Sequence, residues 1–303
     1  MGSPEFAVPT LRAVLEVAEV VCVVTQPDKP AGRGQKMVPP AVKVLAEERG
    51  IPVLQPKSAR APELLDALRR LAPDVGVVVA YGKILPQALL DVPRHGCLNV
   101  HGSLLPRYRG AAPIQWAVIR GETETGITIM KLDAGMDTGP MLLSRRVAIA
   151  DDDTAGTLAA KLSGIGAELM VVALSRLAAG ALVETAQDDA LATMAPMLKK
   201  DDGRVDWTRP AAEVRDRIRG VDPWPGAFTA LGGEPLKLWG PRLAEGAGAP
   251  GRILGVDAAG VVVACGSGAI TVAELQAPGR KRMPATAFVS GRALPGGTVL
   301  GVV

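Results

Sequence analysis

Residues 61–101 read APELLDALRRLAPDVGVVVAYGKILPQALLDVPRHGCLNVH, and this stretch decides the fold class of the first half of the chain. An amphipathic helix over 61–71 precedes an apolar strand over 75–80, and a short helix over 85–90 precedes a strand over 97–101. Apolar strands that alternate with helices predict a parallel sheet with crossover connections. In such sheets, reactive groups gather where the strands end at their carboxyl side.

The same alternation extends outward from this stretch. Strands are predicted over 20–25 and 51–54 around a helix over 38–48, and a further helix is predicted over 114–120. After Gly121, strands are predicted over 126–132 and 141–149. A long helix is predicted next, which starts after Asp153 or Thr154 and ends near 177. We therefore expect an α/β domain with a parallel sheet over residues 1–180.

The last third of the chain has a different pattern. Residues 181–203 are predicted to be a linker, and one helix is predicted over 210–219. Short strands broken by Gly and Pro are then predicted over 236–239, 251–256, 261–265 and 269–275. This spacing is typical of a small β-barrel, which we place in a second domain over residues 204–303.

Composition narrows the class of protein. The chain has 303 residues, 48 % of them apolar and 21 % charged, which is globular usage. Only nine residues are aromatic, which argues against base stacking as the main mode of binding a nucleic acid. No apolar run reaches the roughly 18 residues that a membrane helix needs, so we expect no membrane contact. The three cysteines are far apart, which is typical of reduced thiols in a cytoplasmic protein. We also expect the protein to be a monomer.

Charge is distributed unevenly along the chain. The net charge is +3, but residues 199–303 hold 14 Lys and Arg against 10 Asp and Glu, whereas the preceding part is nearly neutral. A basic loop, Gln26-Pro-Asp-Lys-Pro-Ala-Gly-Arg-Gly-Gln-Lys-Met37, adds Lys29, Arg33 and Lys36. Both features suit a polyanion such as RNA, although a solvated surface explains charge alone equally well.

Two histidines limit the choice of a neutral-pH base. His95 lies in a turn, whereas His101 ends the apolar run Cys97-Leu-Asn-Val-His101. Because strand residues alternate between faces, Asn99 and His101 point the same way. A capping pair at a strand end is the plain alternative to a site.

Two glycine-rich loops follow this strand. The first is Gly102-Ser-Leu-Leu-Pro-Arg-Tyr-Arg-Gly110, and the second is Leu132-Asp-Ala-Gly-Met-Asp-Thr-Gly139. An Asn, a His and a carboxylate suit acyl transfer to an amine, because His and Asp can manage protons and an amide can stabilise an oxyanion. Asp137 is preferred as the carboxylate because it lies deeper in its loop, and Asp133 remains a rival.

Other patterns are excluded by their context. Gly246-Ala-Gly-Ala-Pro-Gly251 has dinucleotide-loop spacing, but it leads into a strand rather than a helix, which argues against an oxidoreductase. No Cys and His set has metal-ligand spacing, so no metal is expected.

Together these segments resemble the methionyl-tRNA formyltransferase family. The resemblance rests on Gly2-Ser-Pro-Glu-Phe-Ala-Val-Pro9, on the basic loop, and on Asn99-Val-His-Gly-Ser-Leu-Leu-Pro-Arg-Tyr-Arg-Gly-Ala-Ala-Pro-Ile-Gln115. It continues through Asp133-Ala-Gly-Met-Asp-Thr-Gly139, Ala195-Pro-Met-Leu-Lys-Lys200, Asp206-Trp207 and Asp222-Pro-Trp-Pro225, and so covers nearly the whole chain.

The resemblance implies a Rossmann-like catalytic domain, an OB-like tRNA-binding domain, and formyl transfer from 10-formyltetrahydrofolate to initiator methionyl-tRNA. It implies catalytic roles for Asn99, His101 and Asp137. It places folate contacts at Ser103, Leu104, Leu105 and Pro106, and tRNA contacts at Lys29, Arg33 and Lys36.

One departure from the family concerns the first strand. Relatives carry an apolar strand before the Gly-Ser-Pro-Glu-Phe loop, whereas here Met1 stands directly before Gly2. We therefore expect this strand to be missing from the sheet.

The closest rival function is formyl transfer to a small amine, such as glycinamide ribonucleotide or an amino sugar. The basic loop and the basic C-terminal part argue against it, because a small acceptor needs neither. A non-catalytic RNA-binding protein is a second rival, and the intact Asn99, His101 and Asp137 set argues against that.

Overall fold

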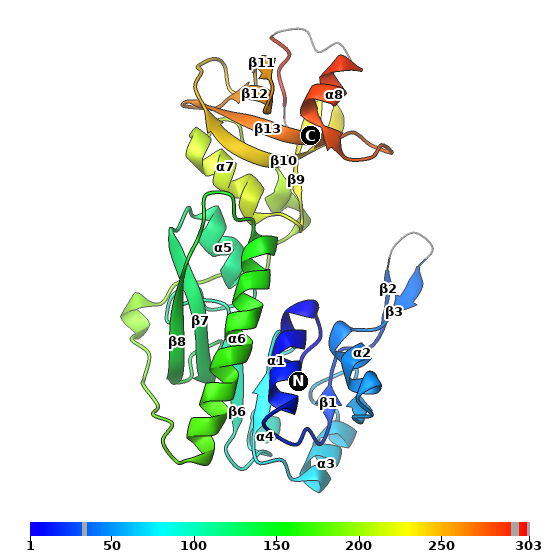
Figure 1. The fold of residues 1–303 in the computed structure, drawn as a ribbon, viewed down its shortest axis with the longest axis vertical. Coiled ribbons are helices and arrows are strands. Elements are labelled where there is room, and N and C mark those ends of the chain that lie inside the picture. The colour runs from blue at the N-terminus through cyan, green and yellow to red at the C-terminus, as the bar shows by residue number, and fades with distance from the viewer. Residues whose placement is uncertain (32–34, 292–296, 302–303) are drawn as a thin grey trace. The chain divides into compact units, whose positions relative to one another are not determined.

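A computed structural model describes residues 1–31, 35–291 and 297–301 of the chain. These residues form two compact units (Figure 1). The first unit comprises Met1–Pro113, Thr125–Val147 and Ala159–Pro196, and the second comprises Ile114–Glu124, Ala148–Leu158 and the rest of the chain from Met197. The segment expected as a linker is thus shared between the two units.

The described strands of the first unit form two sheets and a two-stranded hairpin. Their bounds are β1 (Val23–Val24), β2 (Lys29–Ala31), β3 (Lys36–Val38), β4 (Val53–Leu54), β5 (Gly76–Val78), β6 (Cys97–His101), β7 (Glu124–Lys131) and β8 (Met141–Ala148). One sheet pairs β1 with β4 in parallel, and the other has the order β5-β6-β7-β8. β5 and β6 are parallel as predicted, whereas β6 and β7 are antiparallel, with His101 opposite Thr128.

Helices cover these strands. They are α1 (Val8–Leu15), α2 (Ala41–Glu48), α3 (Pro62–Leu71), α4 (Gln87–Leu90) and most of α6 (Ala155–Ala178), and η1 (Glu5–Ala7) is a short 3-10 helix. Helix α5 (Pro113–Ile119) lies in the second unit from Ile114 onward. Leu64 and Leu68 of α3 pack with Val24, Val78 and Leu89 in one buried cluster. This cluster holds the crossover helix against both sheets.

Helix α6 is long and apolar enough to cross a membrane by length and composition. Its buried residues argue for a core helix instead, since Leu162 and Met170 are fully buried and the Ser163 hydroxyl donates to the Phe6 carbonyl at 2.7 Å. Its extent agrees with the long helix predicted from the sequence.

Met1 and Gly2 join the two sheets of the first unit. The Gly2 amide donates to Val24 O at 3.0 Å, the Val79 amide donates to Met1 O at 2.9 Å, and Gly2 pairs with Val79 in parallel. The N-terminal nitrogen of Met1 donates to the Val77 carbonyl at 2.6 Å. Met1 and Gly2 therefore pair with the backbone of β1 on one side and with the backbone of β5 and Val79 on the other.

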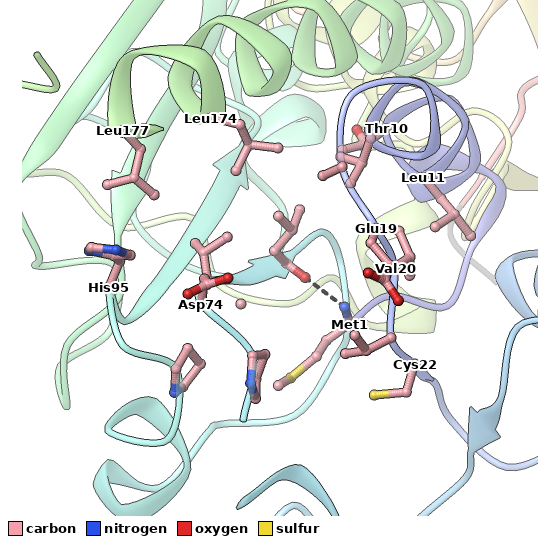
Figure 2. A pocket seen from close by; sticks show the side chains of 18 of the residues that line it. Met1, Thr10, Leu11, Glu19, Val20, Cys22, Asp74, His95, Leu174 and Leu177 are labelled. Carbon is pink, nitrogen blue, oxygen red and sulfur yellow. Dashed lines mark hydrogen bonds between the residues drawn. The ribbon is translucent and has the colours of Figure 1, made fainter. Parts of the chain in front are cut away.

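A cavity of about 1030 Å³ lies beside Met1 (Figure 2). It is lined by Val20, Cys22, Asp74, His95 and Leu174 among others, and by neither Asn99, His101 nor Asp137. The cavity is therefore separate from the residues that the sequence proposes for chemistry. His95 is exposed on its rim and donates its backbone amide to Asp74 O.

The second unit contains a sheet that its own C-terminal residues close. The strands are β9 (Ala227–Leu231), β10 (Glu234–Ala244), β11 (Ile253–Asp257), β12 (Gly260–Ala264), β13 (Ala269–Gln276) and β14 (Met283–Pro284), in the antiparallel order β11-β12-β13-β10-β9, with β14 on β13. Val299 bridges to Arg252 beside β11, and Gly301 bridges to Ala230 on the opposite edge strand β9. Joining the two edges in this way makes the small β-barrel that the strand spacing predicted and that the family resemblance implied to be OB-like.

Helix α7 (Ala211–Gly220) is anchored by a buried arginine. The Arg219 guanidinium donates to the carbonyls of Ala150, Asp151 and Asp153 at 2.8–3.1 Å and to Asp216 Oδ1 at 3.0 Å. The sequence analysis missed α1, the β2–β3 hairpin, β9 and α8 (Ala285–Ser290), which are short or lie in Gly- and Pro-rich segments.

Two glycines of α6 should respond in opposite directions to alanine. A Cβ on Gly164 meets nothing within 4 Å, so Gly164→Ala should stabilise the protein by about 0.5–1 kcal/mol through helix propensity. A Cβ on Gly166 would lie 2.6 Å from Val100 Cγ1, so Gly166→Ala should destabilise it by about 1–3 kcal/mol. Thermal unfolding of the two variants checks this, and shifts of the same sign would contradict the packing of α6 on β6.

Candidate active site

Strand β6 places Asn99 and His101 at the carboxyl end of the sheet. Cys97, Leu98, Val100 and His101 are each at most 4 % exposed, and Asn99 is half-buried. The buried side chains of Cys97, Leu98 and Val100 fix the orientation of the strand. Because successive side chains alternate between the two faces, Asn99 and His101 then share one face. The side-chain amide of Asn99 makes no hydrogen bond to the residues that the structure describes.

The two nitrogens of His101 have different partners. Nε2 lies 2.9 Å from the carbonyl of Tyr108, and because a carbonyl only accepts, Nε2 carries the proton of this bond. Nδ1 lies 3.6 Å from Asp137 Oδ2, which is close for an ion pair but long for a hydrogen bond. Nδ1 is thus the ring nitrogen whose lone pair faces the Asp137 carboxylate.

Asp137 is held in place from its carboxylate and from its backbone. Its Oδ2 accepts from the Gly110 amide at 2.8 Å, which ties the second glycine-rich loop to the first. Its φ of +55° lies in the left-handed region, which costs a non-glycine residue free energy and needs support from its surroundings. The structure brings this aspartate, and not its rival, to His101.

Asp133 has a different role in the same loop. Its carboxylate accepts from the Thr138 hydroxyl at 2.8 and 2.9 Å and from the Gly135 amide at 3.1 Å. These bonds span only five residues, so Asp133 shapes the loop that carries Asp137.

The loop of residues 103–106 is held by Thr128, a residue of the family-like segment Glu124-Thr-Gly-Ile-Thr128 to which the sequence analysis assigned no role. The buried Thr128 hydroxyl donates to Ser103 O at 2.7 Å and accepts from the Leu105 amide at 3.2 Å. The Ser103 hydroxyl itself donates to Arg107 O at 2.6 Å, so Ser103 is fully buried and already paired. Leu104 and Pro106 are half-buried and leave apolar surface open to a ligand. A polar residue within an apolar strand was the available signal for Thr128.

A segment from residues 181–196 completes the surroundings of the first loop. Arg109 donates its amide to Thr193 O at 2.8 Å and accepts from the Ala195 amide at 2.7 Å, and the Thr193 hydroxyl accepts from the Tyr108 amide at 2.9 Å. Part of the predicted linker therefore forms backbone hydrogen bonds with the loop that contacts His101. No local pattern in the sequence identifies this pairing, because the partners lie more than 80 residues apart.

The basic loop forms a hairpin. β2 and β3 pair antiparallel, with Lys29 opposite Val38, and Lys29 and Lys36 are exposed. Arg33 lies outside the described residues. Next to these lysines, Met37 and Val38 are also exposed, at 58 % and 49 %, so the hairpin presents both cations and apolar side chains to a partner.

The base of the hairpin is anchored by a carboxylate. Asp28 accepts from Gln55 at 2.7 Å and from Lys43 at 2.9 Å, and these hydrogen bonds lower the pKa of its carboxyl below the ordinary value. Asp28 thus remains ionised and holds the start of β2 at neutral pH.

Two cysteines are buried away from this site. Burial raises the pKa of the Cys97 and Cys265 thiols to about 11, so both are protonated at neutral pH. Among the described residues, no group of three or more His, Cys, Asp or Glu side chains could hold a metal ion.

Comparisons with known proteins cover the whole chain. The formyl transferase family model matches residues 8–174, and the model of the formyl transferase C-terminal domain matches residues 197–293. The methionyl-tRNA formyltransferase of Geobacter sulfurreducens is 57 % identical over 99 % of this chain and 95 % of that protein. The Myxococcus xanthus methionyl-tRNA formyltransferase is 50 % identical over 98 % and 96 %.

Solved structures share the fold at lower identity. The N-formyltransferase of Helicobacter canadensis, in complex with folinic acid and dTDP-3-aminofucose, has a TM-score of 0.66 at 16 % identity and covers 89 % of this chain and 96 % of that one. HypX from Aquifex aeolicus, in complex with tetrahydrofolic acid, has a TM-score of 0.60 at 20 % identity and covers 80 % of this chain but 43 % of that one. At such identities the likeness concerns the fold.

Two buried threonines provide a matched test of the loop anchor. Thr128→Val removes a hydroxyl that pairs two backbone groups, and should cost about 1–3 kcal/mol of stability. Thr10 is equally buried, but its hydroxyl has no hydrogen-bond partner within the described part of the chain, so Thr10→Val should leave stability unchanged or raise it. Denaturant unfolding compares the two, and equal losses would contradict the role of the Thr128 hydroxyl.

Proposed function

The chain belongs to the methionyl-tRNA formyltransferases, and we propose that Asn99, His101 and Asp137 transfer a formyl group from 10-formyltetrahydrofolate to the amino group of initiator methionyl-tRNA. The observation that carries the assignment of residues is the arrangement at the end of β6. Nδ1 of His101 faces the Asp137 carboxylate at 3.6 Å, and Asn99 lies two residues before His101 on the same strand face.

The proposed chemistry follows from these groups. The amine nitrogen attacks the formyl carbon, and the Asn99 amide donates a hydrogen bond to the oxyanion that develops. His101 accepts the proton that the amine loses, and Asp137 stabilises the resulting imidazolium. The tetrahedral intermediate then collapses, and the bond between the formyl carbon and the folate nitrogen breaks. This nitrogen takes up the proton from His101 as tetrahydrofolate leaves, which returns the imidazole to its neutral form.

The donor is proposed to bind at Ser103, Leu104, Leu105 and Pro106. Thr128 and the Ser103 hydroxyl fix this loop through internal hydrogen bonds, which leaves the half-buried side chains of Leu104 and Pro106 to contact the folate. A rigid loop with exposed apolar groups suits an aromatic ligand.

The tRNA is proposed to contact the hairpin, through Lys29, Arg33 and Lys36, and the barrel domain of residues 204–303. The positive balance of residues 199–303 and the exposure of the hairpin lysines support this division, with catalysis in residues 1–180 and a connection over 181–203. We also propose that the enzyme acts as a monomer, since one chain supplies all three catalytic residues, and in the cytoplasm, where charged tRNA is used.

The decisive experiment follows the fate of the formyl group. The protein is incubated with labelled 10-formyltetrahydrofolate and charged initiator tRNA, with glycinamide ribonucleotide as the competing acceptor. We expect label on the tRNA and none on the small amine, and the reverse result would favour the small-acceptor function.

Replacing the proton-handling residues should abolish most turnover. His101→Ala and Asp137→Ala should each lower kcat by about two to four orders of magnitude, the usual contribution of a positioned acid or base. Binding of the folate donor, measured by equilibrium titration, should change much less. A variant with near-normal kcat would remove that residue from the mechanism.

Replacing Arg33 separates a tRNA acceptor from a small one. Arg33→Ala should lower kcat/KM for charged tRNA, leave the KM of the donor unchanged, and make the salt dependence shallower by about one unit of slope, because one phosphate contact is lost. Arg70→Ala, at an exposed position of α3, is the matched control and should change none of these. If Arg33→Ala behaves like Arg70→Ala across salt concentrations, the hairpin does not bind the tRNA.

A further inference from the structure

We propose that Gln187 is a positioning residue that holds the Asp137 loop at the distance from His101 that the reaction needs, an inference that rests on the proposed function. Gln187 lies in the segment that the sequence analysis took for a linker. Among the described residues its side chain hydrogen-bonds to the backbone of the Asp137 loop and to Arg109, and not to His101 or to the Asp137 carboxylate, so its effect is exerted through the backbone of the loop.

All the polar capacity of the Gln187 side chain is directed at the two glycine-rich loops. Its Nε2 donates to Asp137 O at 2.8 Å and to Gly139 O at 2.7 Å. Its Oε1 accepts from Arg109 Nε at 3.0 Å and from Arg109 Nη2 at 2.8 Å. One half-buried amide thus bridges the loop that follows β6 and the loop that follows β7.

The bridge acts on Asp137 from two sides. On one side, Gln187 binds the carbonyl of Asp137, whose left-handed φ of +55° must be held by its surroundings. On the other side, it fixes Arg109, and the next residue, Gly110, donates its amide to Asp137 Oδ2 at 2.8 Å. Gln187 therefore holds the backbone of Asp137 directly, and it holds the Asp137 carboxylate indirectly through Arg109 and Gly110.

Arg109 supplies a rigid end for this bridge. Its side chain is only 8 % exposed, and its guanidinium pairs with Asp189 Oδ1 at 2.7 Å, while Asp189 itself is 82 % exposed. The backbone bonds of Arg109 to Thr193 and Ala195 fix its main chain. Asp189 therefore contacts the cation without touching the Asp137 loop, which makes it a control for the charge of Arg109.

Glutamate at position 187 separates the two ends of the bridge. Gln187→Glu keeps an oxygen for Arg109 but places a second oxygen against the carbonyls of Asp137 and Gly139, so both donated bonds are lost. We expect kcat to fall about 10- to 100-fold, the effect of a misplacement of the order of 1 Å, while the KM values for tRNA and donor stay within about twofold. Gln187→Met, which lacks donors and charge, should lower kcat in the same way, and Asp189→Asn should leave kcat unchanged.

A double-mutant cycle shows whether Gln187 works through Asp137. Once Asp137→Asn has removed the carboxylate, adding Gln187→Glu should lower kcat by less than about threefold, because the group that it positions is gone. Two losses that multiply, or Gln187 variants that keep kcat within twofold, would overturn the inference. Unchanged kcat in Asp137→Asn alone would instead overturn the role of Asp137 in the proposed function, and the inference with it.

Discussion

Burial of strand β6 on both of its faces is the constraint on which the site depends. Four of its five residues are at most 4 % exposed, so the strand has one register and one facing that keep its apolar side chains out of water. A slip of one residue would turn Asn99 and His101 to the opposite face. Burial of the apolar side chains thus fixes the positions of Asn99 and His101, although these two polar residues contribute little to the hydrophobic effect.

The loops that leave β6 and β7 create a second requirement, which is the pairing of their backbone groups. A buried loop must find partners for its amides and carbonyls outside regular structure. Thr128, Thr193 and Gln187 provide these partners with hydroxyl and amide side chains from a neighbouring strand and from residues beyond α6. The same hydrogen bonds that satisfy the loops bring Gly110 and Asp137 together, so loop stability and site geometry have one cause.

The second unit solves a related problem by closing its sheet. Its two edge strands would expose unpaired backbone groups, but residues 299–301 bridge to both of them. The Thr229 hydroxyl donates to Gly301 O at 2.7 Å and accepts from Trp207 Nε1 at 2.9 Å, so the buried Trp207 supports the closure. Among the described residues, the closed sheet therefore leaves neither edge strand without backbone partners.

The sequence by itself determined the α/β class, the barrel, the exact extent of β6 and the shared face of Asn99 and His101, because these follow from local periodicity and alternation. Tertiary structure alone placed Asp137 rather than Asp133 beside His101, set which ring nitrogen of His101 donates to the Tyr108 carbonyl, and brought Thr128 and Gln187 to the two loops. It also showed that β2 and β3 form a hairpin and that part of the linker packs on the first loop. These features rest on hydrogen bonds between residues 7 to 85 positions apart, whose formation depends on packing that no local pattern encodes.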